Sequence, residues 1–261
     1  MANDTKKRYG FVIDVSRCID CRACMVACSV ENTVPYNHTR IWVHDQGVQG
    51  EWPNFTRSFV PYNCMHCENP PCTEVCVSGA TYKNKDNGLV LVDQEACIGC
   101  GFCAEACPYD VRYIDEKRGV VDKCNGCFQR VETGQMPACV STCVGGSRLF
   151  GDFNDPESSV SKALKGANSV IRLDARRQDG KSTEPNIYYI NAPAEMLNLV
   201  TTDKFGQIEG KVPEASEYTL SEELWKKLII PMLGAATVAT IGVQAVFFTK
   251  QMIEGEKEFE D

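Results

Sequence analysis

The sequence predicts an α+β chain with two interlocked cysteine-rich units, an extended segment and one transmembrane helix. Two observations predict this fold. All sixteen cysteines fall into four groups of four, and a short apolar strand pattern precedes the first and third groups. Near the C-terminus, 22 consecutive residues carry no charge.

The four groups have related spacings. The first and third both read C-x2-C-x2-C-x3-C, and Pro108 follows the third. The second reads C-x2-C-x4-C-x3-C and the fourth C-x2-C-x11-C-x3-C, so every group ends in C-x3-C. The groups are Cys18, Cys21, Cys24, Cys28; Cys64, Cys67, Cys72, Cys76; Cys97, Cys100, Cys103, Cys107; and Cys124, Cys127, Cys139, Cys143.

The spacing of the first and third groups is that of bacterial ferredoxin ligands. A cubane needs one thiolate on each of four irons, so four complete groups indicate four [4Fe-4S] clusters. The loop of the first three cysteines curls around one cluster. The fourth cysteine usually starts a short helix, faces away and ligates the other cluster of a pair. The sequence therefore predicts two interlocked ferredoxin-like units that conduct electrons.

Other functions fit the composition less well. Disulfide frameworks belong mostly to short secreted chains, whereas this chain has 261 residues. Zinc ribbons do not explain the repeated cysteine triplets. The net charge of −8 argues against nucleic acid as a partner. We find no Ser–His–Asp set, phosphate loop or dinucleotide fingerprint, so we expect no catalytic residue.

The remaining elements follow in chain order. Residues 10–14 and 88–93 are expected strands that lead into the first and third cysteine loops, as in an internal repeat. Residues 36–62 are aromatic-rich and predict an ordered loop-and-strand insertion. It either offers a docking surface or covers cluster edges, and we favour the second. We expect a helical turn at 128–132, a helix near 158–165 and a strand at 185–190.

The apolar run at residues 228–249 is long enough to cross a hydrocarbon core of about 30 Å as a helix. A buried core helix is the alternative, but few soluble helices lack a polar stripe over such a length. Lys226, Lys227 and Lys250 flank the run, and Ala235 and Ala239 would let another helix approach closely. Basic residues are nearly balanced at its two ends, so the charge pattern gives no orientation.

We therefore divide the chain into four parts. Residues 1–153 form the four-cluster domain, and residues 154–227 form an extended segment with a short helix and strand. The transmembrane helix occupies 228–249, and 250–261 form an acidic tail. Because the cluster domain has few aliphatic residues, metal ligation must supply much of its folding free energy, and the apo form should be unfolded or molten.

Six stretches of this chain resemble a known family: residues 18–28, 64–72, 97–108, 123–127, 134–139 and 185–189. They resemble the four-cluster iron–sulfur subunits of molybdopterin oxidoreductases, which include polysulfide, thiosulfate, tetrathionate and dimethyl sulfoxide reductases. The terminal helix is more similar to the membrane-anchored beta subunit of respiratory formate dehydrogenase. Val77 and Val144 depart from the pattern, because relatives often have proline there.

The resemblance implies crossed ligation. It implies cluster 1 with Cys18, Cys21, Cys24 and Cys143; cluster 2 with Cys28, Cys124, Cys127 and Cys139; cluster 3 with Cys64, Cys67, Cys72 and Cys107; and cluster 4 with Cys76, Cys97, Cys100 and Cys103. Some relatives replace the middle cysteine of the third group and hold a three-iron cluster there. This chain keeps Cys100, so we expect a full cubane.

The resemblance also implies a non-catalytic subunit of a respiratory complex. It would relay electrons between a molybdopterin catalytic subunit at cluster 1 and an integral membrane, quinone-reactive subunit at cluster 4. One alternative is a relay in a quinone-reducing complex without an active molybdenum site, fed by a partner such as a multihaem cytochrome c. Others are a membrane-tethered polyferredoxin carrier and an assembly subunit whose clusters never turn over.

The resemblance further implies a location at the inner membrane, with the cluster domain on the periplasmic face. The first ten residues have neither an apolar signal region nor a twin-arginine pair. Export would therefore depend on a partner that carries the signal.

Several charged residues and histidines stand near the cysteines. Arg17, Arg22, Lys123 and Arg130 either offset cluster charge or form surface ion pairs. His66 lies inside the second group, where it could ligate or donate a hydrogen bond. Four cysteines are already present, so we disfavour ligation. We interpret His38 and His44 as ordinary loop histidines.

Overall fold

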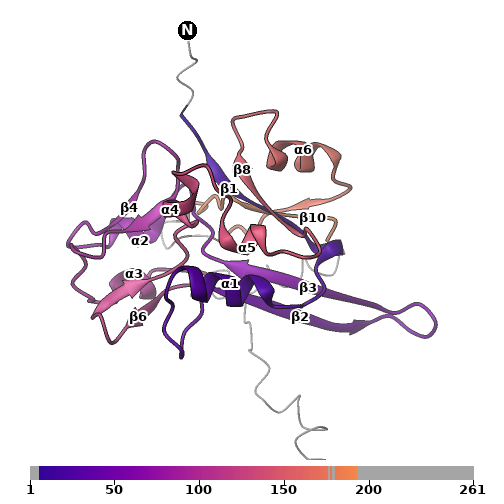
Figure 1. The fold of residues 1–261 in the computed structure, drawn as a ribbon, viewed down its shortest axis with the longest axis horizontal. Helices are drawn as coiled ribbons and strands as arrows, with labels where there is room; N and C mark the ends of the chain where they lie inside the picture. Colours follow the sequence, from indigo (N-terminus) through magenta and orange to yellow (C-terminus); the bar gives the residue numbers. More distant parts are fainter. Residues whose placement is uncertain (1–5, 176, 178–179, 193–261) are drawn as a thin grey trace, which may run out of the picture. The chain divides into compact units, whose positions relative to one another are not determined.

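The fold is described from a computed structural model, which describes residues 6–175, 177 and 180–192. Figure 1 shows the arrangement of the elements. In chain order they are β1 (Tyr9–Asp14), η1 (Val15–Arg17), α1 (Ala23–Glu31), β2 (Ile41–Gln49), β3 (Thr56–Asn63), α2 (Pro71–Glu74), β4 (Thr81–Lys83), β5 (Val90–Val92), α3 (Phe102–Glu105), β6 (Tyr113–Asp115), β7 (Val120–Asp122), α4 (Phe128–Val131), α5 (Ala138–Ser141), β8 (Arg148–Asp152), α6 (Ser159–Gly166), β9 (Val170–Ile171) and β10 (Ile187–Ile190).

Strand β1 lies inside the largest sheet of the described residues, whose strand order is β8-β1-β10-β9. It pairs with β8 antiparallel and with β10 parallel, so Phe11 lies opposite both Phe150 and Ile187. Segments from both ends of the described chain therefore meet in one sheet. The expected strands at 10–14 and 185–190 are confirmed.

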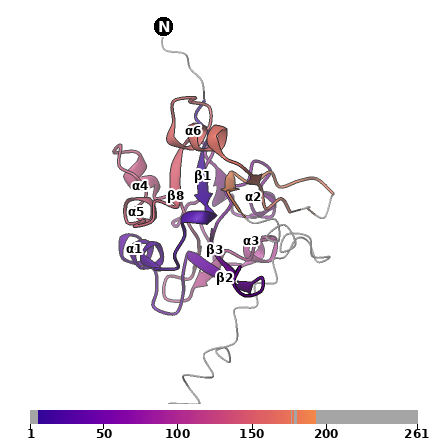
Figure 2. The ribbon, with the colours of Figure 1, turned by 90° about the vertical axis from the view of Figure 1, so that its right-hand side faces the viewer.

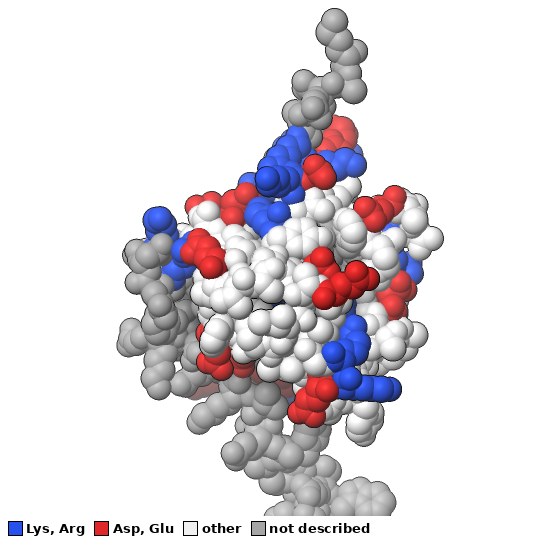
Figure 3. All heavy atoms as spheres, turned by 90° about the vertical axis from the view of Figure 1, so that its left-hand side faces the viewer, with Lys and Arg blue, Asp and Glu red and all other residues white. Residues whose placement is uncertain are grey.

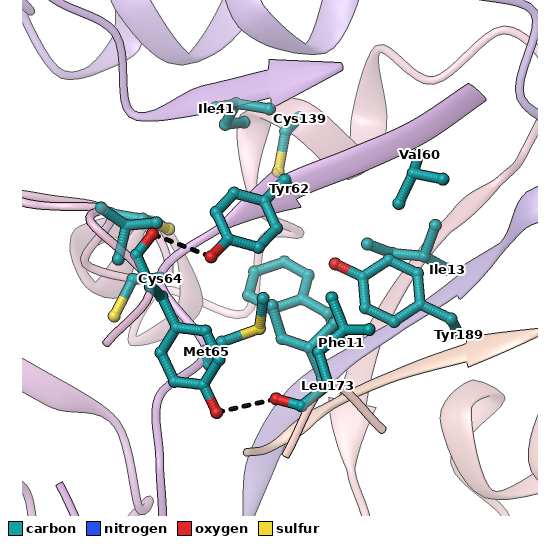
Figure 4. Packing of buried hydrophobic residues seen from close by; sticks show 14 of the residues in the cluster. Phe11, Ile13, Ile41, Val60, Tyr62, Cys64, Met65, Cys139, Leu173 and Tyr189 are labelled. Carbon is teal, nitrogen blue, oxygen red and sulfur yellow. Dashed lines mark hydrogen bonds between the residues drawn. The ribbon is translucent and has the colours of Figure 1, made fainter. Parts of the chain in front are cut away.

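The two faces of β1 support different layers, because successive side chains point to opposite sides of a strand. Phe11 and Ile13 belong to the main core, which Tyr62 of β3 and Tyr189 of β10 also join. Figure 4 shows these side chains packed together, with Cys64 and Cys139 among the residues around them. Val12 instead packs with Val160 of α6 on the other face, and Figure 2 shows α6 beside β1 and β8. The sheet is thus covered on both sides and supports the cysteine loops on one of them.

The middle of the sequence forms two small antiparallel hairpins, β4–β5 and β6–β7. They occupy the left of Figure 1, near α2 and α3. A small apolar cluster lies between them, in which Val90 and Val121 pack with Cys72 and Cys103. The strand expected at 88–93 is confirmed as β5, but it pairs locally with β4 and does not enter the large sheet.

Strands β2 and β3 form a long hairpin with an irregularity between Asp45 and Val48. It extends to the right in Figure 1. Our interpretation that the aromatics of this insertion cover cluster edges is wrong at the tip. There Trp52 and Phe55 are 83% and 53% exposed, because the hairpin extends past the core. Near the base, Tyr62 is buried and its hydroxyl donates to the Tyr109 carbonyl at 2.8 Å.

The helical turn expected at 128–132 and the helix near 158–165 are confirmed as α4 and α6. The short strand β9 was not expected. The run at 228–249, like all residues after 192, lies outside the described residues. Within the part of the chain that the structure describes, no helix is long and apolar enough to cross a membrane. Our domain boundaries stay predictions.

Candidate iron–sulfur sites

The four cysteine groups repeat one backbone turn. The residue immediately before the second cysteine of each group has a left-handed φ, between 45° and 68°. These residues are Asp20, His66, Gly99 and Gly126. Glycine adopts this conformation freely, and Asp and His tolerate it better than most residues. At Gly99 a Cβ would also lie 2.2 Å from the Gly119 carbonyl oxygen, so only glycine fits there.

The groups also share a helical turn. In each, the third cysteine is the second residue of a helix: Cys24 in α1, Cys72 in α2, Cys103 in α3 and Cys139 in α5. The expectation that the fourth cysteine starts a helix is wrong. The fourth cysteine lies about one helical turn after the third cysteine. It falls within α1 for Cys28 and just past the end of the helix in the other groups. This turn separates the third and fourth thiols.

The first and fourth groups meet through long-range contacts. Cys18, Cys21 and Cys24 line a cavity together with Cys143. Burial raises the pKa of the Cys18 thiol, and the nearby Cys24 and Cys143 raise it further. The four thiols predicted for cluster 1 therefore face one space.

The second and third groups meet in the same way. Cys64, Cys67, Cys72 and Cys107 line a second cavity. Burial raises the pKa of the Cys107 thiol to about 11, and its neighbour Cys72 contributes to the rise. The four thiols predicted for cluster 3 are thus brought together.

Cluster 2 has support of another kind. Burial raises the pKa of the Cys28 thiol well above its ordinary value, with further contributions from Cys124, Cys139 and Cys127. For cluster 4 the contacts are fewer. Cys97 and Cys103 share the small core cluster, while Cys76 accepts a hydrogen bond from the Thr81 amide at 3.2 Å. All four ligand sets stay predictions.

The donor chemistry fits a cubane. All sixteen cysteines lie within the described residues and are free thiols. In that same part of the chain, no group of three or more His, Cys, Asp or Glu side chains is arranged to hold a single metal ion. A cubane places its four thiolates on four different irons, so its ligands need not converge on one point.

Buried positive charge gives a second test of the fit. Lys123, Arg112 and Arg148 are at most 6% exposed, and no carboxylate of the described residues forms an ion pair with any of them. Nε and Nη1 of Arg148 are buried and have no hydrogen-bond partner among the described residues. A buried cation is costly unless it is paired. Anionic thiolate-bound clusters would supply the missing negative charge.

Arg112 and Arg148 were missed in the sequence analysis, although a signal existed. Each stands five residues after the last cysteine of its group, Cys107 and Cys143 respectively. Burial alone would lower the pKa of both guanidinium groups, but neighbouring cysteines outweigh it and raise them. A repeated offset from a ligand was therefore the available clue.

The other charged candidates differ in environment. Arg22 pairs with Asp20 and Arg130 with Glu31, both in partly exposed ion pairs, and Arg17 is exposed. Arg22 and Arg130 thus form ion pairs at the surface, but Arg22, like Arg17, also lines the cluster 1 cavity, so a role in offsetting cluster charge stays a prediction for these two. Lys123, in contrast, is buried, and its Nζ donates to the Cys124 carbonyl at 2.8 Å.

The histidines have identifiable environments. His66 is fully buried, and its Nδ1 accepts a hydrogen bond from the Val90 amide at 3.1 Å. Burial holds the pKa of His66 well below its ordinary value, which favours the neutral ring. His38 stacks on Tyr113 with ring centroids 4.2 Å apart, and His44 meets Tyr62 edge-on.

Exposure differs along the predicted series of clusters. Cys21 of cluster 1 and Cys100 of cluster 4 are exposed. All four cysteines of cluster 2 are buried, as are Cys64, Cys67 and Cys72 of cluster 3. The fold thus gives two sites with a surface opening and two without.

Together, the fold and the cysteine sites define an iron–sulfur electron-transfer protein. Two family models, both described as a 4Fe-4S dicluster domain, match residues 11–77 and 55–153. The chain is 40% identical over 186 residues to a subunit of tetrathionate reductase from Salmonella typhimurium, covering 71% of this chain and 73% of the relative. It is 40% identical over 192 residues to the thiosulfate reductase electron transfer subunit of Salmonella typhi, covering 69% and 100%. It is 38% identical over 187 residues to a subunit of polysulfide reductase from Wolinella succinogenes, covering 70% and 94%.

The chain belongs to this family, the electron-transfer iron–sulfur subunits of molybdopterin respiratory reductases. It carries four [4Fe-4S] clusters in two dicluster domains, and it is not the catalytic subunit. A catalytic subunit is its implied partner.

Proposed function

We propose that clusters 1, 2, 3 and 4 form one series in that order and that the chain relays single electrons along it, between a molybdopterin catalytic subunit at one end and a quinone-reactive membrane subunit at the other. The observation that carries the proposal is the exposure pattern. Cys21 and Cys100, in the first and last sites, are exposed, whereas the cysteines of cluster 2 are buried. A relay needs openings only where electrons enter and leave.

The order of the clusters has support from electrostatic interactions between thiols of neighbouring sites. Cys124, a proposed ligand of cluster 2, lies close enough to Cys64 of cluster 3 for the two thiols to interact. Cys72 of cluster 3 interacts in the same way with Cys103 of cluster 4. Cys139 of cluster 2 interacts with Cys24 of cluster 1. These neighbours form an unbranched series.

Apolar residues surround both openings. Ile19 and Val144 are 62% and 78% exposed beside the cluster 1 cysteines, and Ile98 and Phe102 are 64% and 56% exposed beside Cys100. Figure 3 views the molecule from the side of α2 and α3 and shows a broad uncharged area with charged residues around it. Such surfaces suit stable docking to protein partners. We propose the molybdopterin subunit at cluster 1 and the membrane subunit at cluster 4.

The membrane attachment rests on sequence alone. We propose that residues 228–249 form a transmembrane anchor and that the cluster domain lies on the periplasmic face of the inner membrane. Residues 1–153, 154–227 and 250–261 would be the cluster domain, the extended segment and the acidic tail. Deleting residues 228–261 should move the chain, expressed without its partners, from the membrane fraction to the soluble fraction. Unchanged fractionation would contradict the anchor.

The relay is tested in the intact complex. Iron analysis should give about sixteen atoms per chain, the number that four cubanes require. Quinol added by rapid mixing should reduce all four clusters within the turnover time. In a Cys100→Ser variant that retains the other clusters, this reduction should slow strongly, whereas a Cys21→Ser variant should still be reduced by quinol but fail to pass electrons onward. Clusters that stay oxidised with quinol in the intact complex would indicate a purely structural role.

A further inference from the structure

A buried cation stands between each consecutive pair of cluster sites. Three separate sets of contacts show these positions. Arg148 is the first. It lines the cavity that holds the cluster 1 cysteines. On the other side, its Nη2 donates to Oδ1 of Asn63, and Nδ2 of Asn63 lies 3.8 Å from Sγ of Cys124 in cluster 2. Arg148 therefore touches the surroundings of both sites.

Arg112 has the corresponding position between clusters 3 and 4. Its Nη2 donates to Sγ of Cys72 at 2.9 Å, and it lines the cluster 3 cavity. Its Nη1 lies 3.3 Å from Oγ1 of Thr81, whose backbone amide donates to Sγ of Cys76 in cluster 4. One guanidinium group thus connects to thiols of both clusters.

Lys123 stands between clusters 2 and 3. Its Nζ donates to the carbonyl of Cys124, a proposed ligand of cluster 2. It also donates to the carbonyl of Val90, which lines the cluster 3 cavity. Lys123 is only 2% exposed, so water screens its charge little.

A fourth buried cation shows what is unusual about these three. Arg40 is also buried, but it forms a salt bridge with the buried Asp122 at 2.6 Å. Its charge is therefore largely balanced within the protein. Arg148, Lys123 and Arg112 form no such pair with a carboxylate of the described residues. Their charges remain available to the clusters on either side.

We propose that Arg148, Lys123 and Arg112 are junction cations, each of which sets the reduction potentials of the two clusters that flank it. The inference rests on the four-cluster relay proposed above. Reduction adds one negative charge to a cluster, and a nearby buried cation stabilises that charge. A cation shared by two clusters also offsets the repulsion between them when both are reduced. Electrons can then move along the series without a large energetic step at any junction.

The test is an anaerobic redox titration of the purified complex, followed by electron paramagnetic resonance. In Arg148→Gln, the reduction equilibrium should fall about tenfold or more for two of the four centres, and tenfold corresponds to about 59 mV for a one-electron couple. Arg112→Gln should shift the other two centres. Lys123→Gln should shift one centre from each of these sets. This overlapping pattern requires no prior assignment of the signals.

Controls separate charge from packing. Arg148→Lys and Arg112→Lys keep the charge and should retain most of the wild-type potentials. Lys162→Gln removes an exposed charge on α6 and should shift none. The proposal is overturned if a glutamine variant shifts a single centre or all four equally, or if the lysine variants shift the potentials as far as the glutamine variants. If one glutamine variant loses iron, the other two variants still test the proposal. The proposal predicts whether the two pairs of shifted centres share one centre (Lys123 with either arginine) or none (Arg148 with Arg112).

The wild-type protein distinguishes this proposal from the relay itself. Fewer than four reducible centres in the wild type would contradict the relay. Four centres that quinol reduces, with no paired shifts in the variants, would uphold the relay and reject the junction cations.

Discussion

The outer cysteine groups, Cys18–Cys28 and Cys124–Cys143, and the inner groups, Cys64–Cys76 and Cys97–Cys107, use the same turn on different scaffolds. In the outer pair α1 packs against α5, beside the large sheet and its core of Phe11, Phe150 and Tyr189. In the inner pair α2 packs against α3, beside two short hairpins that have a small apolar cluster of their own and join the main core only at one side, through residues such as Cys64, Cys67 and Leu91. The same turn therefore holds metal both on a large sheet and on short hairpins at the edge of the core.

Iron removal should separate the two pairs most strongly. Because metal binding supplies folding free energy where the apolar core is small, chelation should abolish amide protection in β4–β5 and β6–β7. The sheet of β1, β8 and β10 should retain partial protection in a molten state. Hydrogen exchange with mass spectrometry measures both regions at once. Equal loss in the two regions would remove the distinction, and a native-like circular dichroism spectrum without iron would contradict metal-dependent folding.

Breaking the buried ion pair between the scaffolds should have the next largest effect. Arg40 precedes β2, whereas Asp122 ends β7 of the inner hairpins, and Tyr113 also donates to this carboxylate. Arg40→Met removes the nearer cation and leaves the buried carboxylate with Tyr113 and with Arg118, whose Nη2 lies 3.8 Å from Oδ2 of Asp122, so the loss should be at most about 3–5 kcal/mol. Anaerobic denaturant titration of the cluster absorbance measures the loss. Glu157→Gln, which breaks the exposed pair with Lys162, should cost less than about 1 kcal/mol; similar losses in both variants would show that burial of the pair is unimportant.

Removing single methylene groups should sharpen the difference in core size. Ile187 of β10 is fully buried, so Ile187→Val should cost about 0.5–1.5 kcal/mol. Ile114 of β6 is 40% exposed, and Ile114→Val should change the stability less. The same denaturant titration compares them. A larger loss at Ile114 would mean that the inner hairpins depend on packing more than their small core suggests.

The smallest expected effect is a pH dependence at the half-buried His44, whose ring meets Tyr62 of the main core edge-on. Burial lowers the pKa of His44 in β2, so protonation disfavours the folded state. The stabilising contribution of neutral His44 is present above the unfolded pKa of about 6.5 and is lost as the pH falls below it. His44→Gln should therefore reduce the loss of stability between neutral pH and about pH 5.5, relative to wild type. An unchanged pH profile would show that His44 is not responsible.

The sequence predicted local features well because they depend on neighbouring residues. The cysteine spacing gave the cluster loops, and the apolar runs around Val12 and Val90 gave β1 and β5. It did not predict that β1 pairs with β10, because strand pairing between distant segments leaves no local pattern. Nor did it reveal the exposed hairpin tip at Trp52, since the residue type alone does not show whether an aromatic side chain is buried or exposed. Arg112 and Arg148 share an offset of five residues from a cysteine, but the offset alone does not show that both side chains are buried.

The pairing of β1 with β8 and β10 also orders events during synthesis. The inner groups lie within residues 64–107, so their segment can close soon after it leaves the ribosome. Strand β1 is made long before its partners, because β8 begins at Arg148 and β10 at Ile187. The first cysteine loop therefore gains its full sheet only after β10 has been made. Assembly then runs from the middle of the chain outward, and the earliest cysteines translated are among the last to be enclosed.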